Sequence, residues 1–204
     1  MEPVAIEPLT RPSVDEASTA LARAFDDSPL WQFLFPNQPA RLHIMARMFR
    51  ATMLDALPFG VVHAARDSTG VIGAATWLPP SGYPITRWRQ AILFARMAVL
   101  FPRAPTRVGD SMRYLRATDK VHPKEMHWYL ALLGVDPTHQ GEGIGARLID
   151  HTLERLDREG LPAYLETDKE SNLAWYARRR FELRETMHPV ASGPPVWTMW
   201  RDPA

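Results

Sequence analysis

The spacing of hydrophobic positions predicts two amphipathic helices in the first third of the chain. Hydrophobic side chains recur at helical intervals over residues 13–25 and 40–57. Ser13 is followed three residues later by Glu16, which predicts a capping box at the start of the first helix. The aromatic segment 28–35 is bounded by prolines and is expected to form a loop or a short turn.

Strand-like patterns lie before and after these helices. Residues 4–9 alternate in part between flanking prolines, which is typical of an edge strand. Two β-rich runs, 60–65 and 71–78, are separated by the turn-forming residues 66–70, and this arrangement predicts a β-hairpin.

The rest of the chain switches repeatedly between the two periodicities. Helical spacing predicts helices at 85–100 and 105–118, which are separated by prolines. The apolar and aromatic run 125–135 is expected to be a central strand, and the helix predicted after it, 141–159, is expected to end at Gly160. The last predicted elements are a strand at 163–167, a short helix at 173–179, and strands at 181–187 and 196–200. This order is typical of an α/β (α+β) fold, with a mixed sheet covered by helices on both faces, and no linker divides residues 1–204.

Composition excludes several classes of protein. The 204 residues are 46% hydrophobic and 23% charged, which excludes a disordered chain. The absence of cysteine excludes a disulfide scaffold, a thiolate metal site and a cysteine nucleophile. A formal net charge of +1 excludes a strongly basic nucleic-acid binder. The first residues lack a secretory signal, and the most apolar stretch, 91–101, is too short to span a membrane, so we expect a cytoplasmic protein without membrane partners.

Three glycines fall within five residues at the start of the predicted helix 141–159. Gly141, Gly143 and Gly145 leave the backbone open to close approach by a ligand. The first turn of a helix also carries unpaired N–H groups and the positive end of the helix dipole. The loop therefore predicts an anion cradle suited to a phosphate.

Other interpretations of this loop fit less well. It does not end in Gly-Lys-Ser/Thr, as a Walker loop does. A dinucleotide fingerprint is met in form by Gly141, Gly143 and Ala146, with Glu166 downstream, but five residues separate the strand from the first glycine and too little chain follows. The glycines can also serve a tight turn that holds no ligand.

The stretch resembles the acyl-CoA loop of the GCN5-related N-acetyltransferase (GNAT) family, whose signature is Q/R-x-x-G-x-G/A. Gln140, Gly143 and Gly145 match its three positions. The similarity continues through 163–167 and 172–176 and is closest to puromycin N-acetyltransferase-like members. It implies a GNAT-like mixed, mostly antiparallel sheet of six or seven strands. We accordingly interpret residues 1–204 as a single acetyltransferase domain, with a helical insertion at 84–120 and an acyl-CoA-binding and catalytic half at 123–204.

The resemblance implies that acetyl-CoA is the co-substrate. The strand backbone around Leu133 and Val135 would pair with the pantetheine arm, and an N–H near Leu133 would serve the thioester carbonyl. Asn172 matches an asparagine that contacts the cofactor arm, and it can also cap the short helix. The pyrophosphate would lie on the backbone amides that follow Gln140, namely those of Gly141, Glu142, Gly143, Ile144, Gly145 and Ala146. The histidines show no metal-ligand spacing, so no metal is expected.

The resemblance also implies a general acid. Tyr176 matches the tyrosine that hydrogen-bonds the sulfur and protonates the departing thiolate, although it can instead be a core aromatic beside Trp175. Arg180 departs from the family, which usually has glycine directly before the next strand, so the end of the short helix is in doubt.

The general base is less clearly indicated. Family members often carry a glutamate on the central strand, where this chain has Tyr129. In a regular strand His127 shares a face with Tyr129, Leu133 and Val135, so it can accept a proton or be structural. Glu166 is the other candidate base, and it can instead orient the substrate amine or satisfy buried backbone groups.

These patterns together predict an N-acetyltransferase that moves an acetyl group from acetyl-CoA directly to a primary amine of a small molecule. Direct transfer is favoured because no thiol is present to form an acyl-enzyme. The alternative is an acyl-CoA-binding regulatory module without catalysis, which Tyr129 in place of a glutamate motivates. A homodimer is left open. Residues 84–118 carry seven arginines and one acid and form either a lid for anions or two helices with solvated arginines. Aromatic residues form either an acceptor pocket or core: Trp31, Phe33, Phe35, Trp77, Tyr83 and Trp88.

Overall fold

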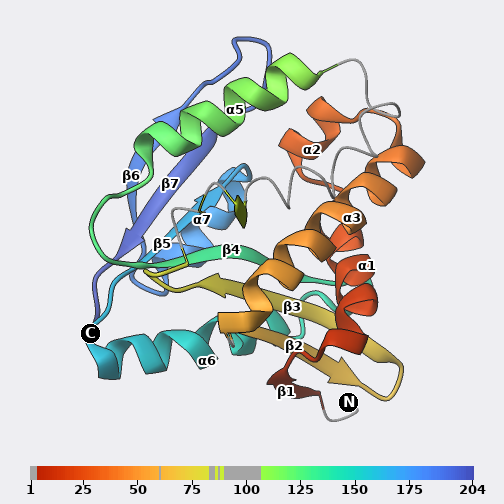
Figure 1. The fold of residues 1–204 in the computed structure, drawn as a ribbon, viewed down its shortest axis with the longest axis vertical. Helices are drawn as coiled ribbons and strands as arrows, with labels where there is room; N and C mark the ends of the chain where they lie inside the picture. Colours follow the sequence, from red (N-terminus) through yellow and green to blue (C-terminus); the bar gives the residue numbers. More distant parts are fainter. Residues whose placement is uncertain (1–3, 60, 83–85, 87, 90–106) are drawn as a thin grey trace.

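A seven-stranded sheet organises the computed structural model, which describes residues 4–59, 61–82, 86, 88–89 and 107–204 (Figure 1). The strands lie in the order β1-β2-β3-β4-β5-β7-β6, and only the pair β4–β5 is parallel. The sheet is therefore mixed and mostly antiparallel, as predicted. The strands are β1 (Ala5–Pro8), β2 (Val62–Asp67), β3 (Gly70–Leu78), β4 (Trp128–Val135), β5 (Ala163–Thr167), β6 (Glu182–Met187) and β7 (Val196–Arg201).

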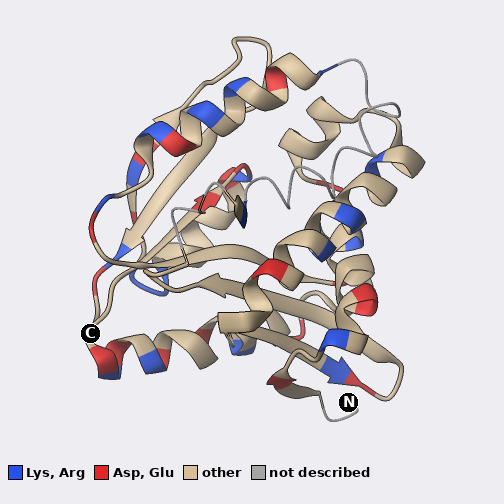
Figure 2. Ribbon diagram, viewed as in Figure 1, with Lys and Arg blue, Asp and Glu red and all other residues tan. Residues whose placement is uncertain are grey.

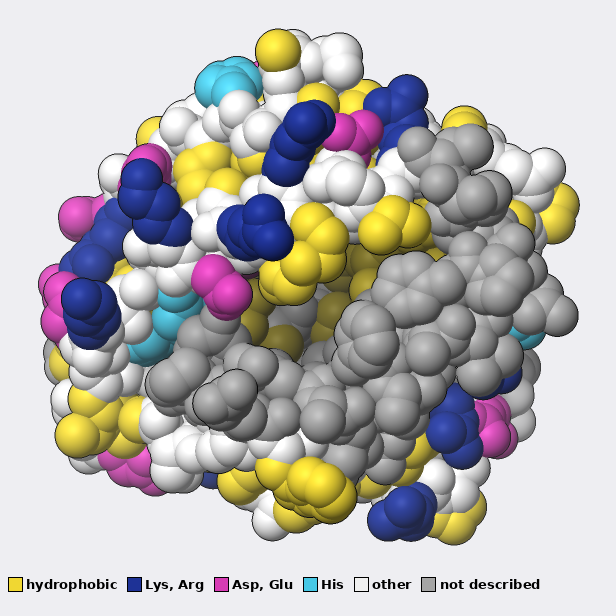
Figure 3. Space-filling view, turned by 45° about the horizontal axis from the view of Figure 1, so that its top comes forward, with side chains coloured by type: hydrophobic (Ala, Val, Ile, Leu, Met, Phe, Trp, Pro, Cys, Tyr) yellow, Lys and Arg dark blue, Asp and Glu magenta, His cyan; other side chains and the backbone are white. Residues whose placement is uncertain are grey.

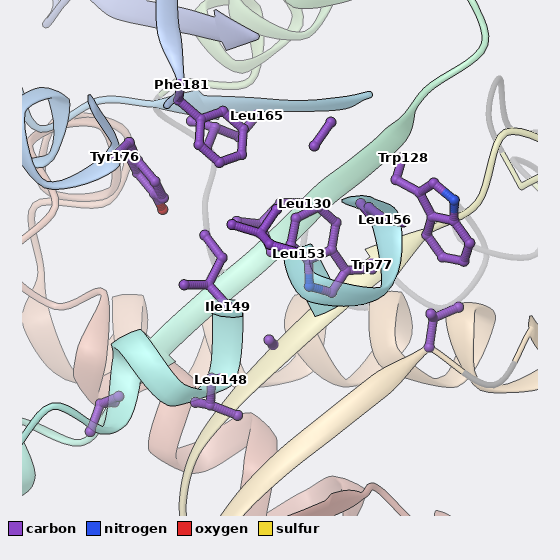
Figure 4. Packing of buried hydrophobic residues seen from close by; sticks show 14 of the residues in the cluster. Trp77, Trp128, Leu130, Leu148, Ile149, Leu153, Leu156, Leu165, Tyr176 and Phe181 are labelled. Atoms are coloured by element: carbon purple, nitrogen blue, oxygen red, sulfur yellow. The ribbon is translucent and has the colours of Figure 1, made fainter. Parts of the chain in front are cut away.

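Helices cover both faces of the sheet. They are α1 (Val14–Ala24), α2 (Pro29–Leu34), α3 (Gln38–Ala56), α5 (Val108–Val121), α6 (Ile144–Glu159) and α7 (Glu170–Ala177). On one face α1 and α3 bury Leu21, Met45 and Phe49 against β2 and β3. On the other face α6 buries apolar side chains such as Leu148 and Leu156 against β3, β4 and β5 (Figure 4). A smaller cluster joins α2 and α5 to the ends of β6 and β7.

Most of the predicted elements are confirmed to within a few residues. The strand at 4–9 is the edge strand β1, and β2 and β3 form the predicted hairpin. The central strand 125–135 begins at Trp128, and the helix predicted at 105–118 corresponds to α5. The predicted helix 85–100 lies almost entirely outside the described residues. Among those residues, no helix is both long and apolar enough to cross a lipid bilayer.

The predicted capping box is wrong, because both of its residues bond to a distant arginine. Ser13 has a helical backbone conformation, and its side chain caps no amide of α1. Arg66 on β2 donates from Nη2 to Ser13 Oγ at 2.9 Å and pairs through Nη1 with Glu16 Oε2 at 3.4 Å. A tertiary contact has therefore replaced the local cap.

The predicted loop at 28–35 is also wrong, because Pro29–Leu34 form the helix α2. Ser28 accepts a hydrogen bond from the Trp31 amide at 3.2 Å, and Pro29 occupies the first turn. Asp168, which follows β5, bonds the Ser28 hydroxyl and accepts from the Leu30 amide at 2.8 Å. The start of this helix depends on a carboxylate about 140 residues away along the chain, which no local pattern reports.

Candidate active site

β4 and β5 separate after three paired residues, and this separation defines the centre of the site. The parallel pairing runs from Trp128↔Ala163 to Leu130↔Leu165. Beyond it, β5 continues against β7, while β4 continues against β3. The other backbone edge of β4, over residues 131–135, pairs with no described strand. This edge offers N–H and C=O groups to an extended ligand.

A β-bulge in β4 decides which side chains face which helix layer. Thr76 lies opposite Leu132 and Trp77 opposite Leu130, so Ala131 is an extra residue on β4. Tyr129 and Leu132 therefore pack with the α1–α3 layer, whereas Leu133 packs with the α6 layer. The predicted common face of His127, Tyr129, Leu133 and Val135 is wrong, because the bulge reverses the alternation.

The glycine loop after β4 ends at an uncapped helix N-terminus. Gly141 and Gly143 have φ of +84° and +77°, so both need the left-handed conformation that glycine tolerates best. The helix begins at Ile144 rather than at Gly141, it has no side-chain cap, and the Arg147 amide donates to the Gly143 carbonyl at 3.1 Å. The amides before Arg147 thus point out of the first turn. A Cβ added at Gly141 or Gly143 meets nothing within 4 Å, so the turn opens into space, as a phosphate cradle requires.

Contacts within the loop hold the cradle against the sheet. Gln140 donates from Nε2 to the Val135 carbonyl at 3.0 Å, so this side chain shapes the loop. Asp136 bonds Thr138 and also Arg23 of α1. Burial raises the pKa of Asp136, but the hydrogen bonds from Thr138 and Arg23 outweigh burial and lower it overall. These contacts connect the loop to β4 and to α1.

Tyr176 lies in the core between α7, α6 and the sheet. It belongs to the same cluster as Leu130, Ile149 and Leu165, and its ring points from α7 toward Leu130 and Ile149 (Figure 4). Burial raises the pKa of the Tyr176 hydroxyl far above its usual value near 10, and Arg179 offsets this only in part. The hydroxyl is therefore protonated at every physiological pH.

Asn172 lies inside the first turn of α7, because this helix begins at Glu170 rather than near residue 173. It is therefore no N-cap. Its Nδ2 donates to Thr167 Oγ1, at the end of β5, at 3.0 Å. Trp175, one turn further, lies 3.8 Å from the Cβ position of Gly145, so α7 and the glycine loop approach each other beside the separated strands.

Polar and aromatic side chains gather where β4 and β5 separate. Glu166 is the first residue of β5 beyond the last pair with β4, and its Oε1 accepts from the Tyr164 hydroxyl at 3.0 Å. His122 follows α5, and its Nδ1 lies 3.8 Å from the same Oε1. His122 Nε2 lies 3.0 Å from His127 Nε2, and the ring of His122 contacts Tyr129 and Tyr164. The structure thus joins both candidate bases through a histidine that the sequence did not single out.

His127 is enclosed at both ring nitrogens. Its Nδ1 lies 2.7 Å from the Glu125 carbonyl, and its Nε2 faces His122. Burial lowers the pKa of His127, and the bond to Glu125 opposes this shift. His127 is therefore a buried neutral histidine at pH 7.

The aromatic residues proposed for an acceptor pocket have separate locations. Trp77 is fully buried beneath α6 and is core. Trp31 stacks on Phe35 and contacts Phe49, and Phe33 packs on Tyr114. Trp88 is 74% exposed. Tyr83 lies outside the described residues.

The described arginines of segment 84–118 are largely paired. Arg89 binds Asp55 through two hydrogen bonds of 2.9 and 2.6 Å, and Arg107 and Arg113 both reach Asp110. Basic and acidic side chains both lie along α5 (Figure 2). Arg87, Arg96 and Arg103 lie outside the described residues. The described part of the segment favours paired, solvated arginines over an anion lid.

The surface is hollowed on the face shown in Figure 3. Hydrophobic side chains form the floor of the hollow, and basic side chains together with an acidic one stand on its described rim. Within the described ranges, no group of three or more His, Asp or Glu side chains is arranged to hold a metal ion.

Two side chains of this region were missed by the sequence analysis. His122 lies five residues before His127 and four residues after the predicted helix 105–118, and the spacing to His127 was its only local signal. Asp168 holds the start of α2, and its position directly after β5 was the corresponding signal. Both act across the fold, so only the structure shows their contacts.

Known proteins share this architecture. The profile of the Acetyltransferase (GNAT) family matches residues 25–181. An N-acetyltransferase of Schizosaccharomyces pombe, described as uncharacterized, is 26% identical over 199 residues, which cover 92% of this chain and 79% of that protein.

Solved structures agree in fold. A crystal structure titled histone acetyltransferase HPA2 and related acetyltransferase, from Corynebacterium glutamicum, is 23% identical with a TM-score of 0.71, covering 100% of this chain and 98% of that one. The Drosophila melanogaster polyamine N-acetyltransferase that forms N-acetylagmatine is 15% identical with a TM-score of 0.56, covering 98% and 100%. With the separated strands and the glycine loop already in place, the family match settles the identity: this chain belongs to the GNAT family and is an acyl-CoA-dependent acetyltransferase.

Proposed function

We propose that the protein transfers an acetyl group from acetyl-CoA directly to the primary amine of a small molecule. The observation that carries this proposal is the continuous path from the free edge of β4 to the open glycine loop. Direct attack by the amine is favoured because the chain has no cysteine to form a thioester intermediate.

The cofactor would lie along this path. The backbone of Leu133 and Val135 suits the pantetheine arm, with the Leu133 N–H toward the thioester oxygen. The amides of residues 141–146 suit the pyrophosphate, because they combine open N–H groups with the positive end of the α6 dipole. Asn172 lies close enough to the end of β5 to contact the arm. Gln140 holds the loop to the end of β4 through its hydrogen bond to the Val135 carbonyl.

The chemistry needs an acid at the sulfur and a base at the amine. Tyr176 is the proposed acid, because its hydroxyl is protonated and its ring points toward β4. Glu166 is the proposed base, because its carboxylate lies where the strands separate and its side chain is 17% exposed. A carboxylate beside tyrosine and histidine rings suits a protonated amine, which both the charge and the aromatic faces attract.

We propose a small acceptor because Asp168, two residues after Glu166, bonds the α1–α2 connection, so that this segment lies beside the end of β5. The interleaved strand order, in which β3 pairs with β4, supports residues 1–204 as one domain.

The proposal is tested by release of the free CoA thiol from acetyl-CoA in the presence of a panel of alkyl and aryl amines. We expect amine-dependent release and an acetylated product detected by mass spectrometry. Tight acetyl-CoA binding in calorimetry without thiol release from any amine would instead favour the regulatory binding module.

A further inference from the structure

We infer that His122 is the second proton acceptor of this acetyltransferase, taking from Glu166 the proton that Glu166 removes from the substrate amine. The inference rests on the proposed function. It is carried by the contacts Tyr164–Glu166–His122–His127, in which the partly exposed carboxylate of Glu166 is linked through His122 to the buried His127 between β4, β5 and the end of α5.

The hydrogen-bond pattern assigns the protons on both imidazole rings. The Glu125 carbonyl can only accept, so His127 Nδ1 carries a hydrogen and donates to it at 2.7 Å. The Nε2 of neutral His127 is then an acceptor, and His122 Nε2–H donates to it at 3.0 Å. Neutral His122 consequently has its lone pair on Nδ1, the atom that faces Glu166 Oε1 at 3.8 Å.

Accessibility separates the two acceptors. The Glu166 side chain is 17% exposed and can meet an amine, whereas the His122 side chain is 6% exposed. His122 therefore acts through Glu166 as a positioning residue. The distance of 3.8 Å exceeds hydrogen-bonding distance by about 0.6 Å, a gap of the kind that often closes when substrate binds.

The reaction explains why a second acceptor is useful. An amine that arrives as an ammonium ion loses one proton before its lone pair attacks and a second after the N–C bond has formed. The C–S bond then breaks, and the thiolate takes a proton from Tyr176. Glu166 can hold only one of the two protons from nitrogen. Transfer of the first from Glu166 oxygen to His122 Nδ1 regenerates the carboxylate for the second. Solvent later removes one proton from His122 and one from Glu166 and returns one proton to Tyr176. One proton is therefore released overall.

His127 ends the relay. A proton passed further to its Nε2 would leave Nδ1–H still bonded to a backbone carbonyl, which cannot carry it onward. His127 therefore fixes the tautomer of His122, in place of the role as base that the sequence left open. Among the described residues, Glu166, His127, Tyr129 and Tyr164 face His122.

The test compares two amines of different basicity. Benzylamine is an ammonium ion at pH 7.5 and must lose two protons, whereas aniline is neutral there and loses one. We expect His122→Gln to lower kcat at least about 10-fold with benzylamine and to change it less than about 3-fold with aniline. The dissociation constant of acetyl-CoA should be unchanged. His63→Gln, which replaces a histidine packed against His151 on α6, is the control and should alter neither rate.

The outcomes separate this inference from the proposed function. A wild-type protein that binds acetyl-CoA and acetylates neither these two amines nor any amine of the panel overturns both. Wild-type turnover of both amines with an equal loss, or no loss, in His122→Gln overturns the relay alone.

A measurement on the wild-type protein does not depend on that variant folding. Long-range ¹H–¹⁵N spectra of the histidine side chains at pH 8 should show His127 protonated at Nδ1 and His122 at Nε2. Protonation of His122 at Nδ1 would contradict the relay, because the atom facing Glu166 would then be a donor.

Discussion

Tyr176 is buried among apolar side chains, and this position sets what its hydroxyl can do. A phenol in such surroundings keeps its proton, because burial disfavours the phenolate. The hydroxyl can therefore donate to a thiolate that forms beside it, and it does not compete as a base.

Tyr176→Phe should lower kcat about 100-fold or more while leaving the dissociation constant of acetyl-CoA unchanged, because it removes only the donated proton. Steady-state kinetics and calorimetry measure the two quantities. Tyr114→Phe is the matched control, because it removes a buried hydroxyl that donates to the Pro194 carbonyl at 2.7 Å. It should cost about 1 kcal/mol of stability and leave kcat intact. A Tyr176→Phe protein with wild-type kcat would remove the assignment of the acid.

Arg180 shows a second local effect, at the end of α7. It has φ of 68°, a left-handed conformation, within a turn in which the Phe181 amide donates to the Tyr176 carbonyl at 3.3 Å and the Arg180 amide donates to the Ala177 carbonyl at 2.9 Å. This is the Schellman arrangement, in which glycine is usual. The sequence placed Arg180 where glycine usually ends this helix. The structure ends the helix there with Arg180 in a strained left-handed conformation, and Tyr176 remains on α7.

Arg180→Gly should stabilise the protein by about 0.5–1 kcal/mol, because relief of the left-handed conformation exceeds the added entropy of the unfolded chain. Urea denaturation measures the change. Arg178→Gly provides the contrast, because Arg178 has a helical φ of −61° and its replacement should cost about 1 kcal/mol. A loss of stability in both variants would show that the contacts of Arg180 with the C-terminal carbonyls matter more than its strain.

At the scale of elements, α6 has left-handed glycines at both ends. Gly143 precedes its first residue and Gly160 follows its last, and an added Cβ meets nothing within 4 Å at either position. The two glycines therefore have the same backbone requirement, and they lie at opposite ends of the helix dipole.

Gly143→Ala and Gly160→Ala should each cost about 1–2 kcal/mol of stability, because both force alanine into the left-handed region. Only Gly143→Ala should weaken acetyl-CoA binding, by about 10-fold or more, because a Cβ there stands where the pyrophosphate would meet the amides. Calorimetry measures the dissociation constant of acetyl-CoA in each variant. Equal affinity in the two variants would indicate that the loop is only a tight turn.

At the scale of the whole molecule, a half-buried histidine couples the sheet to α6. His63 on β2 packs against His151 on α6 with ring centroids 4.5 Å apart, and its buried Nδ1 has no hydrogen-bond partner among the described residues. Burial, with the nearby charges of His151 and Arg155, lowers the pKa of His63 to about 4. The folded protein thus resists a protonation that the unfolded chain accepts below pH 6.5.

Stability should fall by about 2 kcal/mol between pH 6.5 and pH 4 through this residue, after allowance for its partial exposure. Above pH 6.5 both states carry neutral His63 and the effect vanishes, whereas near pH 4 the folded state also protonates and the loss levels off. Urea denaturation of wild type and His63→Gln across this range should give a shallower slope for the variant. Parallel slopes would mean that other groups dominate acid unfolding.

The sequence by itself determined most of the order of the elements, the glycine turn before α6 and the family resemblance. These features depend on short-range spacing: partial alternation in β1, β-rich runs in β2 and β3, helical periodicity in α1, α3 and α6, and glycines at alternate positions around the start of α6. Each depends on backbone preferences and on the burial of one face, which neighbouring residues express directly.

Only the tertiary structure decided which polar side chains meet. Arg66 contacts both residues of the predicted capping box, and Asp168 bonds the start of α2 in the segment predicted as a loop. The bulge at Ala131 changes which side chains of β4 face each helix layer. His122 reached Glu166 from the end of a different helix. Such contacts depend on the geometry of segments far apart in the chain, because hydrogen bonds and ion pairs require atoms within a few ångströms whatever their separation in sequence.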